Sequence, residues 1–248
     1  SSGLIIPGYN GIKINVIKSL LKLEKLGKWD ETQIVYEEIK PYLTISDFKP
    51  EPIHFGNPNK PMVSLIFKVA WGNEYLIDLL RILYQSKVKA TFFLNGSWTY
   101  KFPQLAKKIK DYGHEIGSHS YSHPDMRGMT IENIKWELKE TNRIIQKELG
   151  LLPKLFTPPS EEYDERVVYC AAQEGMYTIL STIDTEDWKN PNPKDIEEKI
   201  RIKLRNGAFI LCHPTETSLI ALPSIIKVMR GNGYKIRTVS KLISTKRL

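Results

Sequence analysis

The stretch Gly117-Ser118-His119-Ser120-Tyr121-Ser122-His123-Pro124 contains two of the five histidines in the chain, four residues apart. Two imidazoles at this spacing can share one face of a helical turn and bind a single ion such as zinc. They could equally be surface histidines flanking a turn, because Gly117, the serines and Pro124 are typical of loops. Loops on a rigid scaffold often carry binding and catalytic groups. The stretch is therefore a candidate metal or catalytic site, and its neighbours decide which scaffold holds it.

The segments on either side alternate between strand-like and helix-like patterns. Apolar or β-rich runs predict seven strands, at residues 62–70, 89–94, 115–118, 154–157, 176–183, 208–212 and 234–239. Amphipathic or capped segments between them predict helices at residues 75–84, 103–112, 131–149, 164–174, 193–205 and 218–229. This alternation predicts an α/β protein with a parallel sheet covered by helices. Seven units favour a (β/α)7 barrel over an open, doubly wound sheet.

The first part of the chain has a different pattern. Residues 12–26 are lysine-rich with apolar residues near helical spacing, and Gly27 offers a stop, which predicts a helix. Residues 31–39 are interpreted as a second short helix. A connector punctuated by five prolines, from Pro41 to Pro61, follows. We therefore predict a small α-rich N-terminal extension with a linker over residues 1–60, and a barrel domain over residues 61–248.

Composition and charge narrow the function classes. Of the 248 residues, 41% are hydrophobic and 26% charged, which is ordinary for a soluble globular protein. No apolar run approaches the roughly 18 residues of a membrane span, and the start shows no signal peptide pattern. The net charge is +8, and residues 199–248 hold eleven Lys or Arg against one acid, Glu216. A basic surface attracts nucleic acid, anionic lipid or acidic wall glycan. The lysines and arginines are not clustered with aromatics, which favours a solvated face and no nucleic-acid partner.

Polar groups follow six successive predicted strands. No glycine-rich dinucleotide or phosphate-binding motif follows any of them, which argues against nucleotide sites. Functional residues of β/α barrels gather at the carboxyl ends of the strands. There the sequence places Lys68, Asn95, His119 with His123, Thr157-Pro158-Pro159, Asp184 to Trp188, and His213. Cys170 and Cys212 form no CxxC motif and are predicted to be two buried thiols.

Two segments carry a family resemblance. Residues 89–96 (KATFFLNG) and 113–123 (GHEIGSHSYSH) closely resemble polysaccharide deacetylases of the NodB-homology type, carbohydrate esterase family 4. The resemblance runs from about Pro61 to Val239. Residues 6–11 (IPGYNG) are similar to a sporulation-associated branch of that family. The resemblance implies a distorted (β/α)7 barrel, in agreement with the strand count.

The resemblance also implies a catalytic machinery. His119 and His123 match the histidines that bind zinc or another divalent metal, which polarises the acetamide and activates water so that acetate and an amine are released. His213 matches a general acid, and Asp187 or Asp184 would hold it in its charged form. Both aspartates could instead cap the next helix. Four further residues are candidates for flanking a sugar, although core packing is the commoner use of aromatics: Tyr121, Pro159, Trp188 and Trp71.

The first family motif is altered. Lys68 stands where the catalytic base is expected, and Val69 where the metal-binding aspartate is expected. Thr157 replaces the arginine that tunes the base. Lys68 is expected to pair with a nearby carboxylate (Glu161, Glu186 or Asp187), or to act as a base with a lowered pKa if buried. With the third ligand missing at Val69, metal binding is predicted to be weak or absent.

Two hypotheses follow. The chain is either a hydrolase for N-acetyl groups of cell-wall glycan, with weak, altered or lost activity, or an inactive glycan-binding pseudoenzyme of the wall or spore. Both predict peptidoglycan or a chitin-like oligosaccharide as the partner, and an exported or envelope-associated location. Both also predict that His119, His123 and His213 converge on one cleft.

Overall fold

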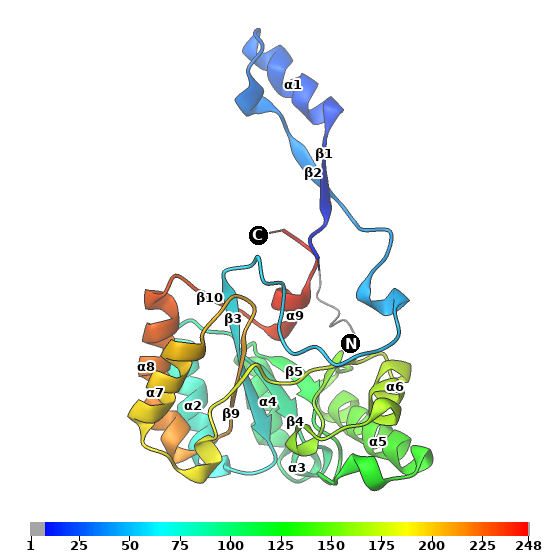
Figure 1. Cartoon of the computed structure of the whole chain (residues 1–248), viewed down its shortest axis with the longest axis vertical. Helices are drawn as coiled ribbons and strands as arrows, with labels where there is room; N and C mark the ends of the chain where they lie inside the picture. Colours follow the sequence, from blue (N-terminus) through cyan, green and yellow to red (C-terminus); the bar gives the residue numbers. More distant parts are fainter. Residues whose placement is uncertain (1–7, 248) are drawn as a thin grey trace.

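The computed structural model describes residues 8–247, so Ile6 and Pro7 of the N-terminal similarity lie outside the described residues. The main body alternates strands and helices along the chain (Figure 1). Its strands are β3 (Met62–Val69), β4 (Thr91–Leu94), β5 (Glu115–Ser118), β6 (Leu155–Phe156), β7 (Tyr177–Thr178), β8 (Ile183–Asp184), β9 (Phe209–Cys212) and β10 (Lys235–Ile236). Its α-helices are α2 (Asn73–Gln85), α3 (Gly96–Lys101), α4 (Pro103–Asp111), α5 (Ile131–Leu149), α6 (Glu165–Gln173), α7 (Pro193–Lys203), α8 (Glu216–Gly231) and α9 (Val239–Ile243).

These strands form one parallel sheet in the order β7-β6-β5-β4-β3-β9-β8, with β10 also pairing with β3. Alternate side chains of β3 enter two apolar layers, as the period of two requires. Phe67 packs in the layer beneath the covering helices, whereas Ile66 packs with Phe93 and Leu211 inside the curl of the sheet. The predicted α/β class and curled (β/α) architecture are confirmed. Cys170 and Cys212 are free and buried, as predicted.

The strand predicted at residues 176–183 is in fact broken. Its first part, β7, pairs with β6, and its last part, β8, pairs with β9 at the opposite edge of the sheet. The chain therefore leaves one edge of the sheet after β7 and joins the opposite edge at β8. Ile53, from the connector, lies beside the break: its N–H donates to Thr178 O at 2.8 Å and its carbonyl accepts from Leu180 N at 3.0 Å. The boundary predicted after residue 60 stays a prediction.

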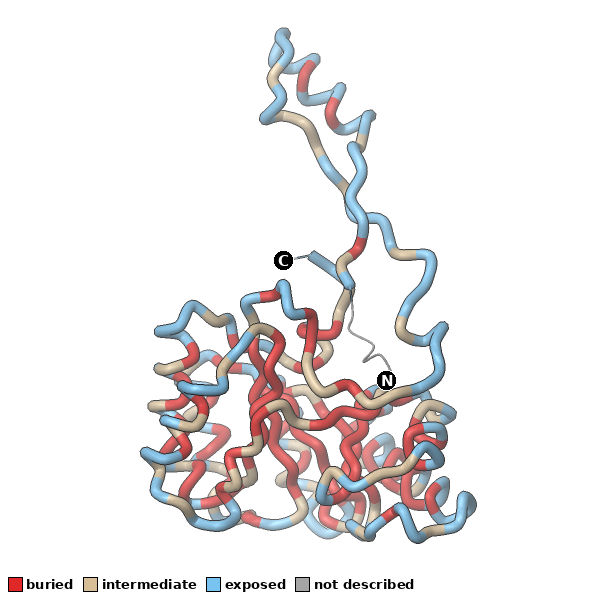
Figure 2. The backbone as a smooth tube through the Cα atoms, viewed as in Figure 1, coloured by how far each residue is buried: buried red, intermediate tan, exposed pale blue. Residues whose placement is uncertain are grey.

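The N-terminal segment forms an arm that projects from the barrel (Figure 1). It consists of β1 (Gly11–Ile14), α1 (Val16–Leu26), the short 3-10 helix η1 (Glu31–Gln33) and β2 (Tyr36–Ile39), with β1 and β2 antiparallel. The helix predicted at 31–39 was wrong, and the helix predicted from residue 12 begins at Val16. Asn15 caps α1 by accepting from Lys18 N, and Gly27 ends it with a φ of 67°. Most of the arm is exposed (Figure 2).

The arm and the carboxyl ends of the strands lie at opposite ends of the molecule (Figure 1). At the base of the arm, Asn10 N donates to Thr245 O at 2.6 Å, and the buried Lys60 donates to the carbonyl of Ser244. The segments after β3, β5 and β9 begin at the far end. No helix within residues 8–247 is both long and apolar enough to cross a membrane.

Candidate functional site

A cavity of about 410 Å³ opens at the carboxyl ends of the strands. Side chains from the ends of β3, β5, β8 and β9, and from the loop after β6, surround it. They are Lys68, Ala70, Trp71, His119, His123, Ser160, Glu161, Asp184, Trp188, Leu211 and His213. The structure thus brings the three predicted histidines and Lys68 together, as parallel strands with a common carboxyl edge require.

His119 and His123 face each other edge to face, with ring centroids 5.0 Å apart. Nδ1 of His119 lies 2.9 Å from the carbonyl oxygen of Thr157. Because a carbonyl can only accept, this contact places the proton on Nδ1 and leaves the Nε2 lone pair free. Burial, reinforced by the nearby Lys68 charge, lowers the pKa of His119 well below its usual value. His119 is therefore neutral at pH 7.

The loop between the two histidines is held by Glu137, a residue that sequence reasoning missed. This buried carboxylate of α5 accepts from the backbone N–H groups of Tyr121 and Ser122 at 2.7 and 2.9 Å, and from the Ser122 hydroxyl. Three donors compensate a buried charge. The loop needs such support because Ser120 and His123 have positive φ values of 58° and 60°, which are uncommon for non-glycine residues. Glu137 lies mid-helix, so only the fold reveals its role.

Lys68 forms an ion pair with Glu161. The Lys68 side chain is 5% exposed, and its Nζ lies 3.0 Å from Oε1 of Glu161. Glu161 also accepts from the backbone and hydroxyl of Ser181, each at 3.0 Å. Of the three partners considered, the structure therefore selects Glu161. Burial lowers the pKa of Lys68, while the charges of Glu161 and Asp184 oppose that shift.

His213 is oriented by Asp187. Nδ1 of His213 donates to Oδ1 of Asp187 at 2.8 Å, and the His213 backbone N–H donates to Oδ2 at 2.6 Å. The hydroxyls of Thr215 and Ser218 also donate to Oδ2, at 3.1 and 2.5 Å. Burial alone would raise the pKa of Asp187, but the hydrogen bonds from His213 and Ser218 outweigh it and keep that pKa low. The Trp71 ring stacks on the His213 ring, with centroids 5.8 Å apart.

Asp184 is placed differently from Asp187. It lines the cavity and accepts from the backbone N–H of Glu186 at 2.8 Å. Its charge acts on Lys68, whereas the carboxylate hydrogen-bonded to His213 is that of Asp187. Asp184 and Asp187 therefore belong to different parts of the site, one beside the cation and the other behind the imidazole.

The aromatic candidates also separate. Trp71 and Trp188 line the cavity and are 47% and 53% exposed, so they are available to stack on a ligand. Tyr121 instead packs edge to face against Trp136, and Pro159 is buried; neither is among the residues lining the cavity. Val69 also lies away from the cavity, in the apolar layer beneath the helices.

The donor set does not fit a divalent metal. Within residues 8–247, no group of three or more His, Cys, Asp or Glu side chains is arranged to hold a metal ion. Lys68 stands in the cavity with His119 and His123, and the two carboxylates of the lining, Glu161 and Asp184, act on this lysine. A structural or catalytic zinc takes at least three protein ligands, and a neighbouring cation repels it. The cavity is thus lined by hydrogen-bonding side chains and by two exposed aromatic faces, Trp71 and Trp188.

Comparisons with known protein sequences find several related proteins. A sequence model of the polysaccharide deacetylase family matches residues 55–179. The uncharacterized protein YlxY of Bacillus subtilis is 45% identical, over 98% of this chain and 76% of its own length. A peptidoglycan-N-acetylglucosamine deacetylase of Bacillus cereus is 32% identical, over 77% of this chain and 72% of its own length.

Solved structures show the same relationship. BA3943 of Bacillus anthracis, described as a CE4 family pseudoenzyme, is 38% identical with a TM-score of 0.87, covering 100% of this chain and 89% of its own. A BA3943 mutant with restored enzymatic activity matches with the same identity and TM-score, over 92% of its own chain.

Proposed function

Because this chain belongs to the polysaccharide deacetylase family, we propose that it binds cell-wall glycan in the cavity at the strand ends without the family's standard deacetylation. One observation carries the proposal: the Lys68 ammonium, 3.0 Å from Glu161, stands where the resemblance expects the catalytic base. The family fold and cavity are kept, while the groups for metal-assisted hydrolysis are not. We place the protein at the cell envelope, where such glycan is found.

Loss of the catalytic base and of the metal should lower the rate of deacetylation strongly. A positioned general base contributes about 10²- to 10⁴-fold to rate, and the metal adds charge stabilisation of the transition state. Burial lowers the pKa of Lys68, and the charges of Glu161 and Asp184 oppose that shift; in the structure its Nζ donates to Oε1 of Glu161 at 3.0 Å and is engaged by that carboxylate. Attack of water on an amide is therefore not assisted by this side chain.

The groups that would hold a glycan are kept. Trp71 and Trp188 present exposed faces at the cavity, and such faces pack against sugar rings. The cavity volume of about 410 Å³ lies within the range of ligand sites. A related Bacillus cereus protein acts on N-acetylglucosamine of peptidoglycan, which supports peptidoglycan as the ligand class.

The geometry of His213 favours a second candidate, a residual hydrolase. The His213–Asp187 pair is complete and fully hydrogen-bonded, as a general acid for a leaving amine requires. In this candidate the acid works without a matched base, so turnover would be slow.

Binding and acetate release separate the two candidates. Wild type should sediment with insoluble peptidoglycan at low salt and release no acetate from it or from chitooligosaccharides. Trp71→Ala and Trp188→Ala should weaken binding, whereas Trp136→Ala, a similarly exposed tryptophan outside the cavity lining, should not. Absence of binding at low salt would overturn the proposal. Acetate release abolished by His213→Ala would establish the hydrolase instead.

A further inference from the structure

Helix α1 presents an uncovered apolar face to solvent. Val16, Ile17, Leu20 and Leu21 are each between 53% and 73% exposed, and Trp29, just beyond the helix, is 69% exposed. At 100° per residue, the four aliphatic residues fall on one continuous arc of the helix. An arc of large exposed aliphatics that ends in a tryptophan is characteristic of a surface that binds something.

A different side of α1, adjacent to this arc, already contacts the rest of the arm. Ser19 and Leu23 are buried against the rest of the arm, and Ser19 Oγ accepts from Val35 N at 2.9 Å. The helix is thus fixed on the arm by its polar and apolar inner contacts, and the outer arc is not needed for that attachment. The described residues place no other element over it (Figure 2).

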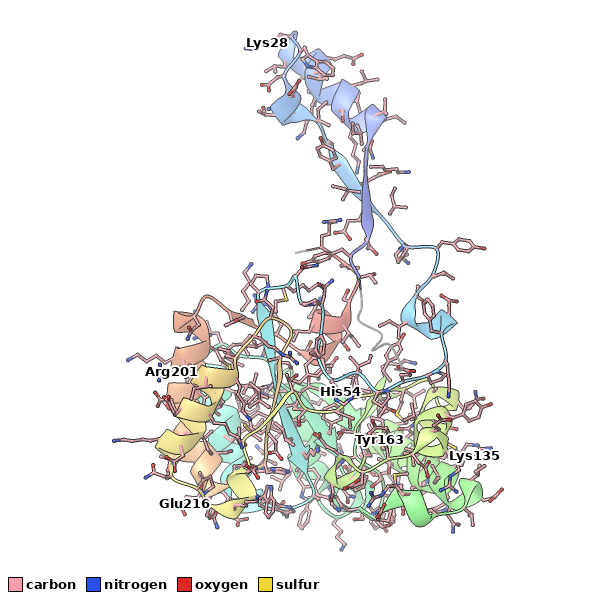
Figure 3. The ribbon with its side chains drawn as sticks, viewed as in Figure 1. Lys28, His54, Lys135, Tyr163, Arg201 and Glu216 are labelled. Carbon is pink, nitrogen blue, oxygen red and sulfur yellow. The ribbon has the colours of Figure 1, made fainter. Side chains whose placement is uncertain are left out.

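Lysines line the apolar arc. Lys18, Lys22 and Lys25 follow it around the helix, and Lys28 lies at the tip of the arm (Figure 3). Residues 16–28 contain four lysines and a single acid, Glu24. A second copy would bring an equally basic face, so self-pairing would place like charges together. The charge instead complements an anionic surface.

The position of the arm suits a surface that lies away from the cavity. Lys28 marks the tip, while Glu216, which opens α8 directly after the His213 segment, lies at the other end of the molecule (Figure 3). A body docked through the tip therefore leaves the cavity at the far end open.

We propose that α1 and Trp29 dock into the interface of a membrane that carries anionic lipid. The aliphatic arc and the indole enter the boundary between head groups and acyl chains, and the flanking lysines contact lipid phosphates. The barrel then stands off the membrane with its cavity facing outward. This inference does not depend on what the cavity binds.

The test is cosedimentation of the full chain with vesicles. Wild type should bind vesicles of phosphatidylglycerol mixed with phosphatidylcholine, should bind pure phosphatidylcholine much less, and should be released by high salt. The variant Ile17→Ser/Leu20→Ser/Leu21→Ser should lose binding. Lys18→Ser/Lys22→Ser/Lys25→Ser should weaken it about fivefold for each lysine removed. Trp29 emission should shift to the blue on binding, and Trp29→Phe identifies that signal.

A matched control removes exposed aliphatics elsewhere: Ile202→Ser/Ile220→Ser on α7 and α8, which are 71% and 60% exposed, should bind as wild type. Because the α1 positions are exposed, circular dichroism and melting temperature should match wild type for every variant. Failure to bind anionic vesicles, or binding that both α1 variants retain, overturns the proposal. So does a concentration-dependent dimer in sedimentation velocity that the aliphatic variant abolishes, because the face would then be occupied by a second copy.

Discussion

Nζ of Lys68 lies 3.0 Å from Oε1 of Glu161, and the two side chains come from the end of β3 and from the loop after β6, two strands that are not neighbours in the sheet. Glu161 reaches this position with a left-handed φ of 59°. A strained, non-glycine conformation persists where the surroundings over-determine it. Here the surroundings are Lys68 and Ser181, so the pair links the end of β3 to the loop after β6.

The Lys68–Glu161 pair should show strong energetic coupling. Lys68→Met and Glu161→Gln should each lower the free energy of unfolding by about 2–4 kcal/mol, because each leaves a largely buried charge without its partner. The double variant should be more stable than the sum of the single losses implies, by at least about 1 kcal/mol. Urea unfolding of the four proteins measures this. The exposed pair Asp78–Arg81 is the control, with expected coupling of about 0.5 kcal/mol or less; equal coupling at both pairs would contradict the argument.

Metal content should depend on the first altered motif. Wild type should purify with little zinc, because two imidazoles beside an ammonium are a poor site. Lys68→Asp removes the cation and adds a carboxylate to the cavity beside the two imidazoles, so zinc by elemental analysis should approach one ion per chain. Adding His119→Gln to that variant should abolish the gain. Stoichiometric zinc in wild type would show that another group supplies the third ligand.

Val69 alone should behave differently. Its side chain is fully buried in the apolar layer beneath the helices. Val69→Asp by itself keeps the Lys68 ammonium and buries a carboxylate, so it should lower the free energy of unfolding by about 3 kcal/mol or more without raising zinc affinity. Thermal unfolding and metal content of the single variant provide the measurement.

Gly72 should be irreplaceable for steric reasons. A Cβ at this position would lie 2.0 Å from the carbonyl oxygen of Pro214, and the glycine has a φ of 81°. Gly72→Ala should therefore cost about 2–4 kcal/mol of unfolding free energy and separate Trp71 from His213. Gly150→Ala measures the cost of a positive φ without a clash, because Gly150 has a φ of 68° and open space around it. This variant should lower the free energy of unfolding by only about 1 kcal/mol. Similar costs at both positions would exclude the clash as the cause.

His114 should make stability depend on pH. Burial, with a contribution from Lys89, lowers its pKa from 6.5 to about 4. Between these values the unfolded chain binds a proton that the folded chain does not, so the free energy of unfolding should fall as pH drops from about 6.5 to about 4, by up to roughly 3 kcal/mol. His114→Gln, which retains an acceptor for Ala90 N, should flatten this dependence. An unchanged pH profile in the variant would assign the effect to other groups.

The alternation of strands and helices could be predicted from the sequence because its signals are local: the spacing of apolar residues and the residues that cap helices. The helix predicted at 131–149 coincides with α5, where Thr130 accepts from Asn133 N and Gly150 ends the helix. The strands of the arm could not be predicted in the same way. Tyr36–Ile39 becomes a strand only by pairing with Gly11–Ile14, and neither segment carries a turn signal that specifies its partner.

The candidate site likewise has features that the sequence predicts and features that it does not. The sequence places His119, His123 and His213 directly after predicted strands. The structure brings these three histidines to one cavity. The ion pairs between side chains of the site could not be predicted from the sequence. Glu161 and Glu186 are equally plausible partners for Lys68 in the sequence, but Glu186 pairs with Lys189 and Lys199 instead. Glu137 carries no sequence signal, because its function depends on how α5 packs against the histidine loop.

Ile53 pairs with the backbone of residues 178–180, beside the break between β7 and β8. This pairing limits how far the chain can be shortened from its N-terminal side. A fragment that starts at residue 61 would lose the hydrogen bonds from Ile53 to Thr178 and Leu180 and would leave the backbone beside β7 without these partners. Unpaired N–H and C=O groups at a sheet edge can pair with the backbone of another molecule. The shortest autonomously folding fragment should therefore begin upstream of Ile53, and shorter fragments should be recovered as aggregates.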